Sequence, residues 1–236
     1  MRVAWLAIAL AACGDNHKLD DHLRPYFEWN GQAKVGSVEL DPYGPEDPGL
    51  LDLIPGHPDS VIMMYAHAPG STVMVDTIEA VLAHAQAAGL PFLTYRDLAA
   101  NVGGTGIALS FDDNSFDEWF AIRDLFTTYD AKVTFFITEY DLATPEQKAE
   151  LHQLADDGHD IEAHTMRHLH GIDVVDNHGL TAYLNDEVLP SIQILEDDGF
   201  ERPLAFAYPY GERTDEMDAA ILEHVAIVRG ISGSLR

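Results

Sequence analysis

Short apolar runs alternate with amphipathic segments along most of the chain. Seven of these runs have the length and composition of buried strands, at residues 61–66, 91–94, 107–111, 132–137, 160–163, 204–207 and 226–229. The longer segments between them carry apolar residues at the spacing of helices with one buried face, at residues 72–88, 115–129, 180–198 and 215–224. Strands that alternate with helices form parallel sheets, so the pattern predicts a parallel α/β barrel.

Local signals mark the boundaries of the predicted helices. Thr144 is the expected N-cap of a further helix, because Pro145 suits the first helical position and Gln147 completes a capping box. Gly158 is expected to end that helix. Pro190 lies inside one of the predicted helices and is expected to kink it, since proline removes a backbone donor.

Two pairs of polar residues follow predicted strands and have the chemistry of a metal site. Asp112 and Asp113 directly follow one strand, and His164 and His168 follow a later one. In a parallel α/β sheet, the carboxyl ends of the strands are where chemistry sits. One carboxylate and two histidines leave ligand positions open, and the second carboxylate is free to act as a base. Either pair alone is more often a solvated surface feature, but together at strand ends they favour a metal site.

Three motifs, in this order, resemble those of a known family. Residues 110–114 (S-F-D-D-N) are similar to the first motif of the polysaccharide deacetylases, carbohydrate esterase family 4, which is usually T-F-D-D-G. Residues 164–168 (H-T-M-R-H) resemble the second motif, H-S/T-x-x-H, and residues 206–211 (F-A-Y-P-Y-G) resemble the third, commonly F-R-P-P-Y-G. The resemblance implies a distorted parallel (β/α)7 barrel, which agrees with the number of predicted strands.

The resemblance also implies roles for the residues at the strand ends. Asp113, His164 and His168 would hold Zn²⁺, or another divalent metal such as Co²⁺ or Ni²⁺, with room left for water and a carbonyl oxygen. Asp112 would act as the general base towards that water. The backbone N–H of Tyr210 would help to stabilise the oxyanion that forms.

The general acid and its surroundings depart from the usual family pattern. His67 is the candidate acid that protonates the leaving amine, although a histidine there is about as often a satisfied core residue. Ala207 stands where the third motif usually has an arginine that orients the base, and Asn114 replaces a glycine. The chain has no match to the family's Asp-and-Trp fourth motif, whose aspartate supports the general acid. Asp41 is the candidate substitute for that aspartate.

The block at residues 61–99 stands in an unexpected place. Its M-M-Y-A-H (63–67) and G-L-P-F-L-T (89–94) resemble the end of a usual family domain, where a strand with L-x-H precedes the last helix. Here the block precedes the first motif, and the sequence stops at Arg236 soon after the strand at 226–229. We interpret this order as a circular permutation, which barrels tolerate because their chain ends lie close together. The alternative is a chance β-α-β unit in a chain with a truncated C-terminus.

The first residues predict secretion and a lipid anchor. A short positive start and an apolar run end in L-A-A-C, which resembles the bacterial lipobox, so residues 1–12 are expected to be a lipoprotein signal peptide. Cys13 would carry the lipid, residues 13–35 would form a tether, and residues 36–236 would form the barrel domain. The expected location is the bacterial cell envelope, on the periplasmic or cell-surface side. The alternative is a buried N-terminal strand with a chance cysteine.

Composition narrows the choice of partners. The net charge is −27, from 40 acidic residues against 13 lysines and arginines, which argues against nucleic acid because phosphate binding needs a basic face. Cys13 is the single cysteine of the sequence, so no disulfide can form within it. No internal apolar run reaches the roughly 18 to 20 residues of a membrane span. An acetylated glycan and, through Cys13, a membrane are the expected partners.

The sequence therefore predicts metal-dependent hydrolysis of N-acetyl groups from an acetylated polysaccharide or oligosaccharide. Retention of both Asp112 and Asp113 favours an enzyme, because a pure binding module needs no base. Loss of the usual arginine and of the fourth motif favours the alternative of a catalytically impaired, membrane-anchored glycan-binding module. A third hypothesis is an O-acetyl esterase with the same metal centre.

Overall fold

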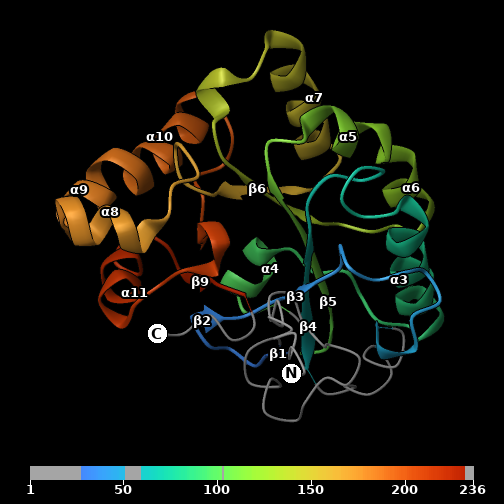
Figure 1. The fold of residues 1–236 in the computed structure, drawn as a ribbon. Helices are drawn as coiled ribbons and strands as arrows, with labels where there is room; N and C mark the ends of the chain where they lie inside the picture. The colour runs from blue at the N-terminus through green and yellow to red at the C-terminus, as the bar shows by residue number, and fades with distance from the viewer. Residues whose placement is uncertain (1–27, 51–59, 103, 232–236) are drawn as a thin grey trace, which may run out of the picture.

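One curled sheet organises the part of the chain that the computed structural model describes, residues 28–50, 60–102 and 104–231 (Figure 1). The predicted signal peptide and Cys13 lie outside these residues. Among the described residues the sheet has nine strands: β1 (Glu28–Trp29), β2 (Lys34–Val35), β3 (Val38–Glu39), β4 (Val61–Ala66), β5 (Gly106–Asp113), β6 (Thr134–Ile137), β7 (Asp160–Ala163), β8 (Ala205–Ala207) and β9 (Ile227–Arg229).

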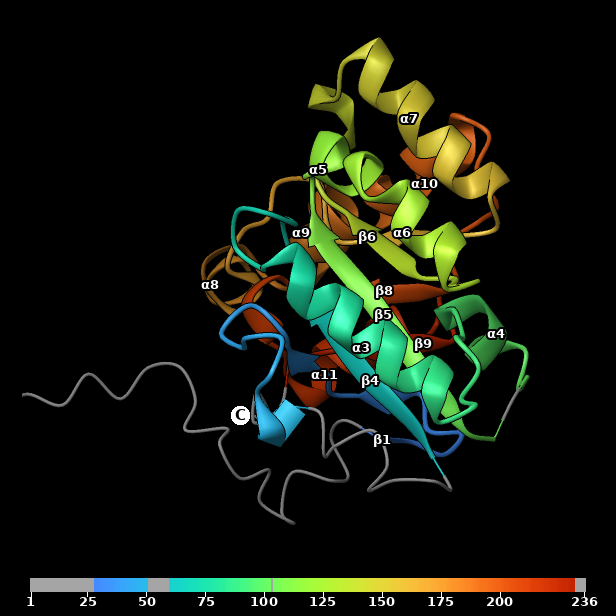
Figure 2. The same ribbon diagram turned by 90° about the vertical axis from the view of Figure 1, so that its right-hand side faces the viewer.

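The helices lie mainly outside the curl of the sheet (Figures 1 and 2). The α-helices that lie fully within the described residues are α3 (Val75–Ala87), α4 (Tyr95–Ala99), α5 (Phe116–Ala121), α6 (Arg123–Thr128), α7 (Pro145–Asp156), α8 (Gly171–His178), α9 (Leu180–Tyr183), α10 (Leu189–Asp197) and α11 (Asp215–Ile221). Short 3₁₀ turns η1 (Tyr140–Leu142) and η3 (Pro209–Gly211) and a π-helical turn η2 (Leu184–Val188) complete the set. None of the helices within these ranges is long and apolar enough to span a bilayer.

The strand pairing confirms the predicted parallel α/β fold. The sheet runs in the order β1-β4-β5-β6-β7-β8-β9-β2, with β3 also paired to β4, and every pair except β1 with β4 is parallel. Residues 34–39 contact both edges of the curl, because β2 pairs with β9 and β3 pairs with β4. The eight parallel strands form a curled sheet that is consistent with a distorted barrel.

Two details of the strand prediction need correction. Residues 91–94 do not form a strand, because only Phe92 makes an isolated bridge, to Ile107. The short strands β1 to β3 had not been predicted, since two residues are too few to show a period of two. β1 and β2 fall within the interval expected to be the tether, and both pair with strands of the sheet.

The sheet is buried on both faces, which explains why its strands are continuously apolar. Alternate residues of β4 join different clusters of the core. Ile62 and Met64 pack outward beneath the helices, whereas Val61 and Met63 face the interior of the curl. The inner cluster also includes Trp29 of β1, so the chain before the first long strand helps to fill the interior.

The helix predictions hold with two local adjustments. The capping box of α7 is present, because Thr144 Oγ1 accepts from Gln147 N at 3.2 Å and Gln147 Oε1 accepts from Thr144 N at 3.0 Å. The helix predicted at 115–129 is two short helices, because Ile122 leaves helical geometry between α5 and α6. The irregularity expected from Pro190 is the π-helical turn η2, which immediately precedes α10.

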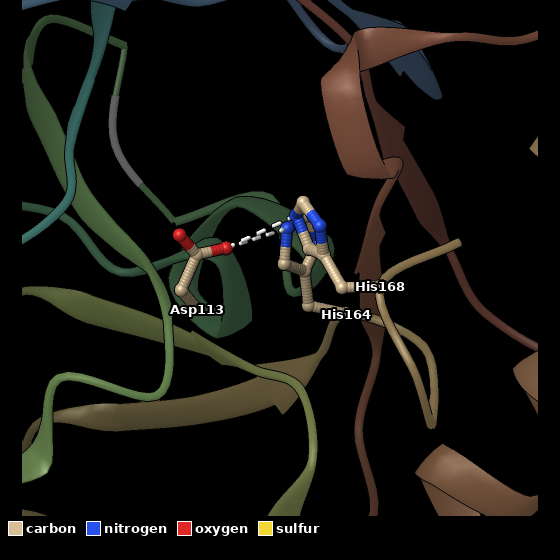
Figure 3. Close-up of side chains that lie close together, drawn as sticks. All are labelled: Asp113, His164 and His168. Carbon is tan, nitrogen blue, oxygen red and sulfur yellow. Dashed lines mark ion pairs between the residues drawn. The ribbon is translucent and has the colours of Figure 1, made fainter. Parts of the chain in front are cut away.

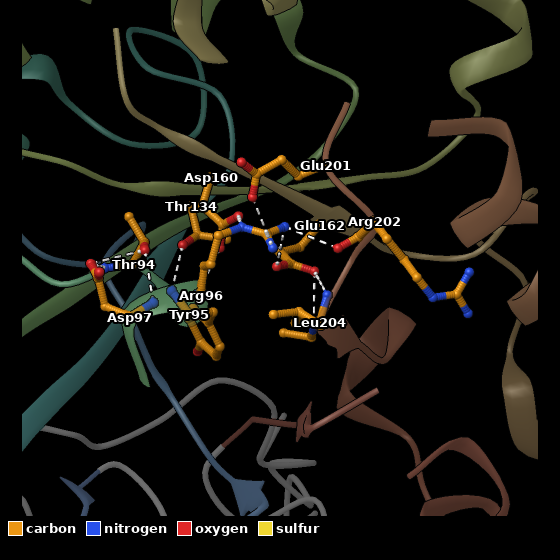
Figure 4. A network of polar contacts seen from close by, with 11 residues as sticks. Thr94, Tyr95, Arg96, Asp97, Thr134, Asp160, Glu162, Glu201, Arg202 and Leu204 are labelled. Atoms are coloured by element: carbon orange, nitrogen blue, oxygen red, sulfur yellow. Dashed lines mark hydrogen bonds and ion pairs between the residues drawn. The ribbon is translucent and has the colours of Figure 1, made fainter. Parts of the chain in front are cut away.

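A polar network fixes α4 to the amino ends of the strands (Figure 4). The Arg96 Nε donates to Asp160 Oδ1 at 3.1 Å, and its guanidinium also forms an ion pair with Glu201. Glu162 accepts from the backbone N–H of Leu204 at 2.7 Å and is fully buried, so burial raises its pKa well above the ordinary value. The network ties the segment that leads into β5 to the opposite end of the sheet from Asp112.

Candidate metal and catalytic site

The predicted site residues gather at the carboxyl ends of the strands, around a cavity of about 380 Å³. The side chains lining it include the six residues singled out from the sequence: His67, Asp112, Asp113, His164, His168 and Tyr210. They come from the end of β5 and from the loops that follow β4, β7 and β8. Since parallel strands place their carboxyl ends at one edge, residues far apart in the sequence share this cavity.

Asp113, His164 and His168 form a set that can hold a divalent metal (Figure 3). Asp113 Oδ1 lies 3.1 Å from Nε2 of His168 and 3.5 Å from Nε2 of His164. The Oδ1 atom is buried and receives no regular hydrogen bond from the described residues. Burial alone raises the pKa of Asp113, but the two facing imidazoles outweigh it and lower the pKa well below its usual range. One carboxylate and two imidazole nitrogens fit Zn²⁺ or a similar divalent ion.

A backbone contact fixes the orientation of one histidine. The Nδ1 of His164 lies 2.8 Å from the carbonyl oxygen of Ala207, the natural partner of a protonated Nδ1. His164 is only 2% exposed, so its ring is held firmly. The Nε2 atom is therefore left to face Asp113, as expected of a ligand whose other nitrogen is bonded to the protein.

Backbone strain is concentrated at the same place. Seven non-glycine residues of the described ranges have positive φ angles. Four of these lie in or beside the site: Asp113 at 88°, Thr165 at 67°, His168 at 51° and Tyr210 at 58°. Such conformations cost about 1–3 kcal/mol each and persist where the surroundings enforce them, often at functional sites.

The loop that carries the histidines is held by the π-helical turn η2. The Met166 N–H donates to the backbone oxygen of Glu187 at 3.1 Å, and the Arg167 N–H donates to the Glu187 carboxylate at 2.9 Å. Thr165 Oγ1 accepts from His168 N at 3.1 Å inside the loop. Glu187 is 4% exposed, and the sequence analysis did not single it out. Its position three residues before Pro190, where a kink was predicted, was the available signal.

Asp112 faces the interior of the curl, where it meets Arg229. The two side chains form a hydrogen-bonded ion pair, and they are 2% and 1% exposed. Asp112 is the register partner of Phe136, which belongs to the inner cluster, so its direction follows from the alternation of the strand. The adjacent side chains of Asp112 and Asp113 therefore point in different directions, one towards Arg229 and one towards the two histidines.

Arg229 lies beside Ala207, the position at which the third motif usually has an arginine. The two residues are register partners on β8 and β9, and both face the interior. The guanidinium of Arg229 lies 4.8 Å from the ring centre of Tyr65 and 5.0 Å from that of Phe136. Burial opposes its charge, but the facing Asp112 outweighs that effect and raises the pKa of Arg229 above its ordinary value. The chain thus carries an arginine against Asp112, supplied by the strand next to the third motif.

The candidate general acid has the partner proposed for it. His67 Nδ1 lies 2.7 Å from Asp41 Oδ2, and the His67 N–H donates to Asp41 Oδ1 at 3.2 Å. Burial lowers the pKa of His67, but the hydrogen bond to Asp41 and the charges of Asp112 and Asp113 outweigh it and raise the pKa to about 9. Asp41 directly follows Leu40, whose N–H donates to Tyr65 O at 2.8 Å. The pairing of the segment after β3 with β4 thus places the Asp41 carboxylate beside His67.

Tyr210 lies in the 3₁₀ turn η3 and lines the cavity with a side chain that is 49% exposed. Its neighbour Gly211 has a φ of 66°, and a Cβ there would lie 2.8 Å from the backbone nitrogen of Ile231. Glycine is therefore required where the two chain segments meet. This close approach fixes the turn that presents Tyr210 to the cavity.

A histidine near the second motif belongs to the core. His159 is 7% exposed and packs against the rings of Phe126 and Phe135. Its Nδ1 accepts from the Val133 N–H at 3.1 Å, and burial lowers its pKa to about 4. His159 is a neutral core residue. It borders a cavity of about 510 Å³ on the Arg96 side that contains no metal-ligand set among the described residues.

Comparisons with known proteins agree with this geometry. A family model described as polysaccharide deacetylase matches residues 99–225, more than half of the chain. The chain therefore belongs to the polysaccharide deacetylase family. A comparison with curated proteins finds no match.

Solved structures of low sequence identity share the fold. The deacetylase PplD of Streptococcus pyogenes, in complex with acetate, is 20% identical with a TM-score of 0.54, over 70% of this chain and 80% of that chain. IcaB from Ammonifex degensii is 16% identical with a TM-score of 0.60, over 75% and 87%. A de-N-acetylase from Aggregatibacter actinomycetemcomitans is 13% identical with a TM-score of 0.60, over 73% and 93%.

Proposed function

We propose that this protein hydrolyses N-acetyl groups of an acetylated polysaccharide or oligosaccharide with the help of a divalent metal, Zn²⁺ being the first candidate. The observation that carries the proposal is the position of Asp113, His164 and His168 in one cavity with Asp112. A ligand set beside a second, non-ligating carboxylate is what metal-assisted hydrolysis requires. Family membership and the names of two similar folds, a deacetylase and a de-N-acetylase, accord with it.

The metal, when bound by Asp113, His164 and His168, would polarise the acetamide carbonyl and make water acidic enough to react near neutral pH. The chain's own residues supply the proton transfers. Asp112 accepts the proton of the attacking water, and the ion pair with Arg229 orients its carboxylate. The Tyr210 N–H is assigned to the developing oxyanion.

The reaction needs a general acid because its leaving group is an amine. An amine leaves poorly unless it is protonated, and His67 with a pKa raised to about 9 holds a proton at neutral pH. An ester oxygen needs this help less, so the His67–Asp41 pair favours N-deacetylation over the alternative of an O-acetyl esterase. Two ion pairs also weigh against the glycan-binding module. Arg229 pairs with Asp112, where the family usually has the arginine of the third motif, and Asp41 pairs with His67, where it usually has the aspartate of the fourth motif.

We further propose that the domain is circularly permuted. The family match starts at residue 99, where the block at 61–99 ends, yet β4 of that block pairs with β5 along its length. The same block contributes His67 to the cavity beside Asp113. A chance β-α-β unit has no reason to bring a histidine to this position.

A lipid at Cys13 and a location in the cell envelope are proposals that rest on the sequence alone, on L-A-A-C after an apolar run. Mass spectrometry of protein extracted from bacterial membranes tests them. A diacylated Cys13 at the mature N-terminus supports the anchor, and an unmodified Met1 terminus excludes it.

The proposed reaction is tested by measuring acetate release across a panel of acetylated glycans, with metal-free protein and after addition of Zn²⁺, Co²⁺ or Ni²⁺. The panel contains peptidoglycan, chitin oligomers, poly-N-acetylglucosamine and acetylated xylan. Release from N-acetylated members that depends on metal supports the proposal. Release from xylan alone would assign an O-acetyl esterase, and no release from any member would favour a binding module.

A further inference from the structure

A second group of metal-ligand side chains lies beside the cavity, apart from the three-residue metal set on which the proposed reaction depends. It consists of Glu39, Asp41 and His67, here called the β3–β4 cluster, and one donor atom of each lies within 4.8 Å of the other two. Glu39 and His67 also line the catalytic cavity, so an ion in the cavity can reach them. The proposed reaction uses His67 with Asp41 and gives Glu39 no role.

The pairing of β3 with β4 brings these side chains to one face of the sheet (Figure 1). Glu39 is the register partner of Tyr65, and Asp41 and His67 each follow two positions later. Residues two apart on an extended chain point the same way. Leu40, between the two carboxylates, packs in the outer core cluster. The register therefore directs two carboxylates and one imidazole towards the interior of the curl.

The distances within the β3–β4 cluster suit a small divalent ion. His67 Nδ1 lies 2.7 Å from Asp41 Oδ2 and 4.0 Å from Glu39 Oε1. Bond lengths of about 2.0–2.2 Å place the donor atoms of a tetrahedral zinc site roughly 3.3 Å apart, between these two values. The Glu39 side chain is 36% exposed, so it can rotate to close the larger gap. One imidazole and two carboxylates are a ligand set that Zn²⁺ and similar ions accept.

The charges around Glu39 also favour a cation. A hydrogen-bonded Asp–His pair needs one carboxylate, and Glu39 adds a second. Among the ion pairs of the described residues, Glu39 has His67 as its partner and no lysine or arginine. Asp41 and Asp112 repel its charge. A divalent ion bound by two carboxylates and a neutral imidazole forms a site without net charge, so it would remove the repulsion within the cluster.

We propose that Glu39, Asp41 and His67 form a second site for a divalent ion such as Zn²⁺, and that an ion bound there inhibits acetate release. The ion takes the place of the proton that Nδ1 of His67 donates to Asp41, and this proton passes to solvent. The ring then carries its remaining proton on Nε2. Losing that proton would leave an imidazolate, so metal-bound His67 is a much weaker acid than the imidazolium, and the leaving amine loses its donor.

The second site should bind its ion more weakly than the metal set does. It has one imidazole instead of two, and the ion must displace a proton. Acetate release should therefore rise as the metal set fills and fall again when Zn²⁺ is in excess. The inhibition rests on the proposed function, whereas binding of the second ion does not.

The binding test titrates metal-free protein with Zn²⁺ in a calorimeter. We expect two ions in the wild type, and in Glu39→Gln an affinity for the second ion that is lower by at least about tenfold, since even the loss of a residue that only supports a ligand costs that much. Glu212→Gln is the matched control, because Glu212 Oε1 also faces a histidine, 3.3 Å from His170 Nδ1, but belongs to neither ligand set. The variant His164→Ala/His168→Ala removes two ligands of the metal set and should retain the weaker site.

The inhibition test measures kcat/KM for acetate release as Zn²⁺ increases beyond one equivalent, with each variant compared with its own rate at one equivalent. Saturation of the second site should lower the rate of the wild type and of Glu212→Gln by about 10² or more, the value of a general acid. Glu39→Gln should need at least about tenfold more Zn²⁺ for the same inhibition.

The two measurements separate this inference from the proposed reaction. A wild type that binds one ion only, or a Glu39→Gln variant that binds the second ion as tightly as the wild type, overturns the second site. A second ion that binds at the β3–β4 cluster but leaves the rate unchanged or raises it overturns the inhibition. If no glycan releases acetate at any metal concentration, the proposed reaction fails, and calorimetry still decides whether the second site exists.

Discussion

Arg229 and Asp112, which are 117 positions apart in the sequence, form a buried ion pair inside the curled sheet. The pair joins β9 to the first carboxylate of the first motif. Asp112 is almost fully buried, and the Arg229 guanidinium is the cation that is hydrogen-bonded to it. The third motif of this chain has Ala207 where an arginine is usual, and Arg229 is the register partner of that alanine.

Replacing Arg229 with methionine tests whether it positions the base. The variant leaves Asp112 buried without its ion-pair partner, which costs about 3–5 kcal/mol of stability, and frees its carboxylate to move. We expect acetate release to fall by about 10² at unchanged metal content, because misplacing a catalytic group by about 1 Å has such effects. Arg213→Met is the matched control, since Arg213 is also buried and pairs with Asp218 outside the cavity. It should lose stability but keep its rate.

Returning the arginine to the third motif should restore activity. In the double variant Ala207→Arg/Arg229→Ala, the new guanidinium starts from the register partner and faces the same interior. We expect a rate clearly above that of Arg229→Ala alone, because the pair couples two neighbouring positions. A folded, metal-loaded double variant that stays as slow as Arg229→Ala would contradict the positioning role.

The metal set makes a separate prediction. His164→Ala and His168→Ala each remove one imidazole from the three donor groups, so the affinity for metal and acetate release should fall together. Elemental analysis of purified protein measures the metal, with His152→Ala as a control because His152 pairs with Asp198 away from the cavity. Metal content at the wild-type level in both variants would show that the site is misassigned.

The metal set was predictable because its signals are local. Asp113 and His164 each follow a short apolar run, and strand ends can be located from the sequence without knowing which strands pair. Asp41, in V-E-L-D at residues 38–41, was also a candidate from the sequence for the missing aspartate of the fourth motif. What the sequence did not give was the distance of 2.7 Å between Asp41 and His67.

Arg229 and His159 were not predictable because their roles depend on pairing and packing. An arginine at the end of an apolar run has many possible partners, and the register of β8 with β9 selects Asp112. His159 follows a glycine at a helix end, a place that is usually exposed. Its burial arises from Phe126 and Phe135, which approach it from other elements.

The His67–Asp41 pair predicts a pH effect. His67 must be protonated to act as the acid, so activity should be lost as pH rises through its pKa of about 9. Asp41→Asn removes a charge that raises this pKa, so the alkaline limb of kcat/KM should move to lower pH. Glu39→Gln is the matched control, because Glu39 Oε1 lies 4.0 Å from His67 Nδ1 against 2.7 Å for Asp41. An alkaline limb that stays in place in Asp41→Asn would remove His67 from the mechanism.

The remaining prediction concerns Asp112, which is both the proposed general base and the ion-pair partner of Arg229. A single substitution tests both roles without changing a metal ligand. Asp112→Asn keeps the shape of the side chain but removes the basic carboxylate, so acetate release should fall by about 10² to 10⁴. The metal should stay bound, because Asp113 and the two histidines are unchanged. Thermal unfolding should also occur at a lower temperature, since Arg229 becomes a buried cation without its anion.

A second variant distinguishes catalysis from stability. Asp112→Asn/Arg229→Met removes both charges, so it should recover part of the lost unfolding temperature while acetate release stays at the low level. Asp113→Asn, in contrast, should lose metal and activity together. If Asp112→Asn releases acetate at the wild-type rate, Asp112 is not the base. If the double variant regains activity along with stability, the loss of acetate release in Asp112→Asn came from the unpaired Arg229 guanidinium and not from the missing carboxylate.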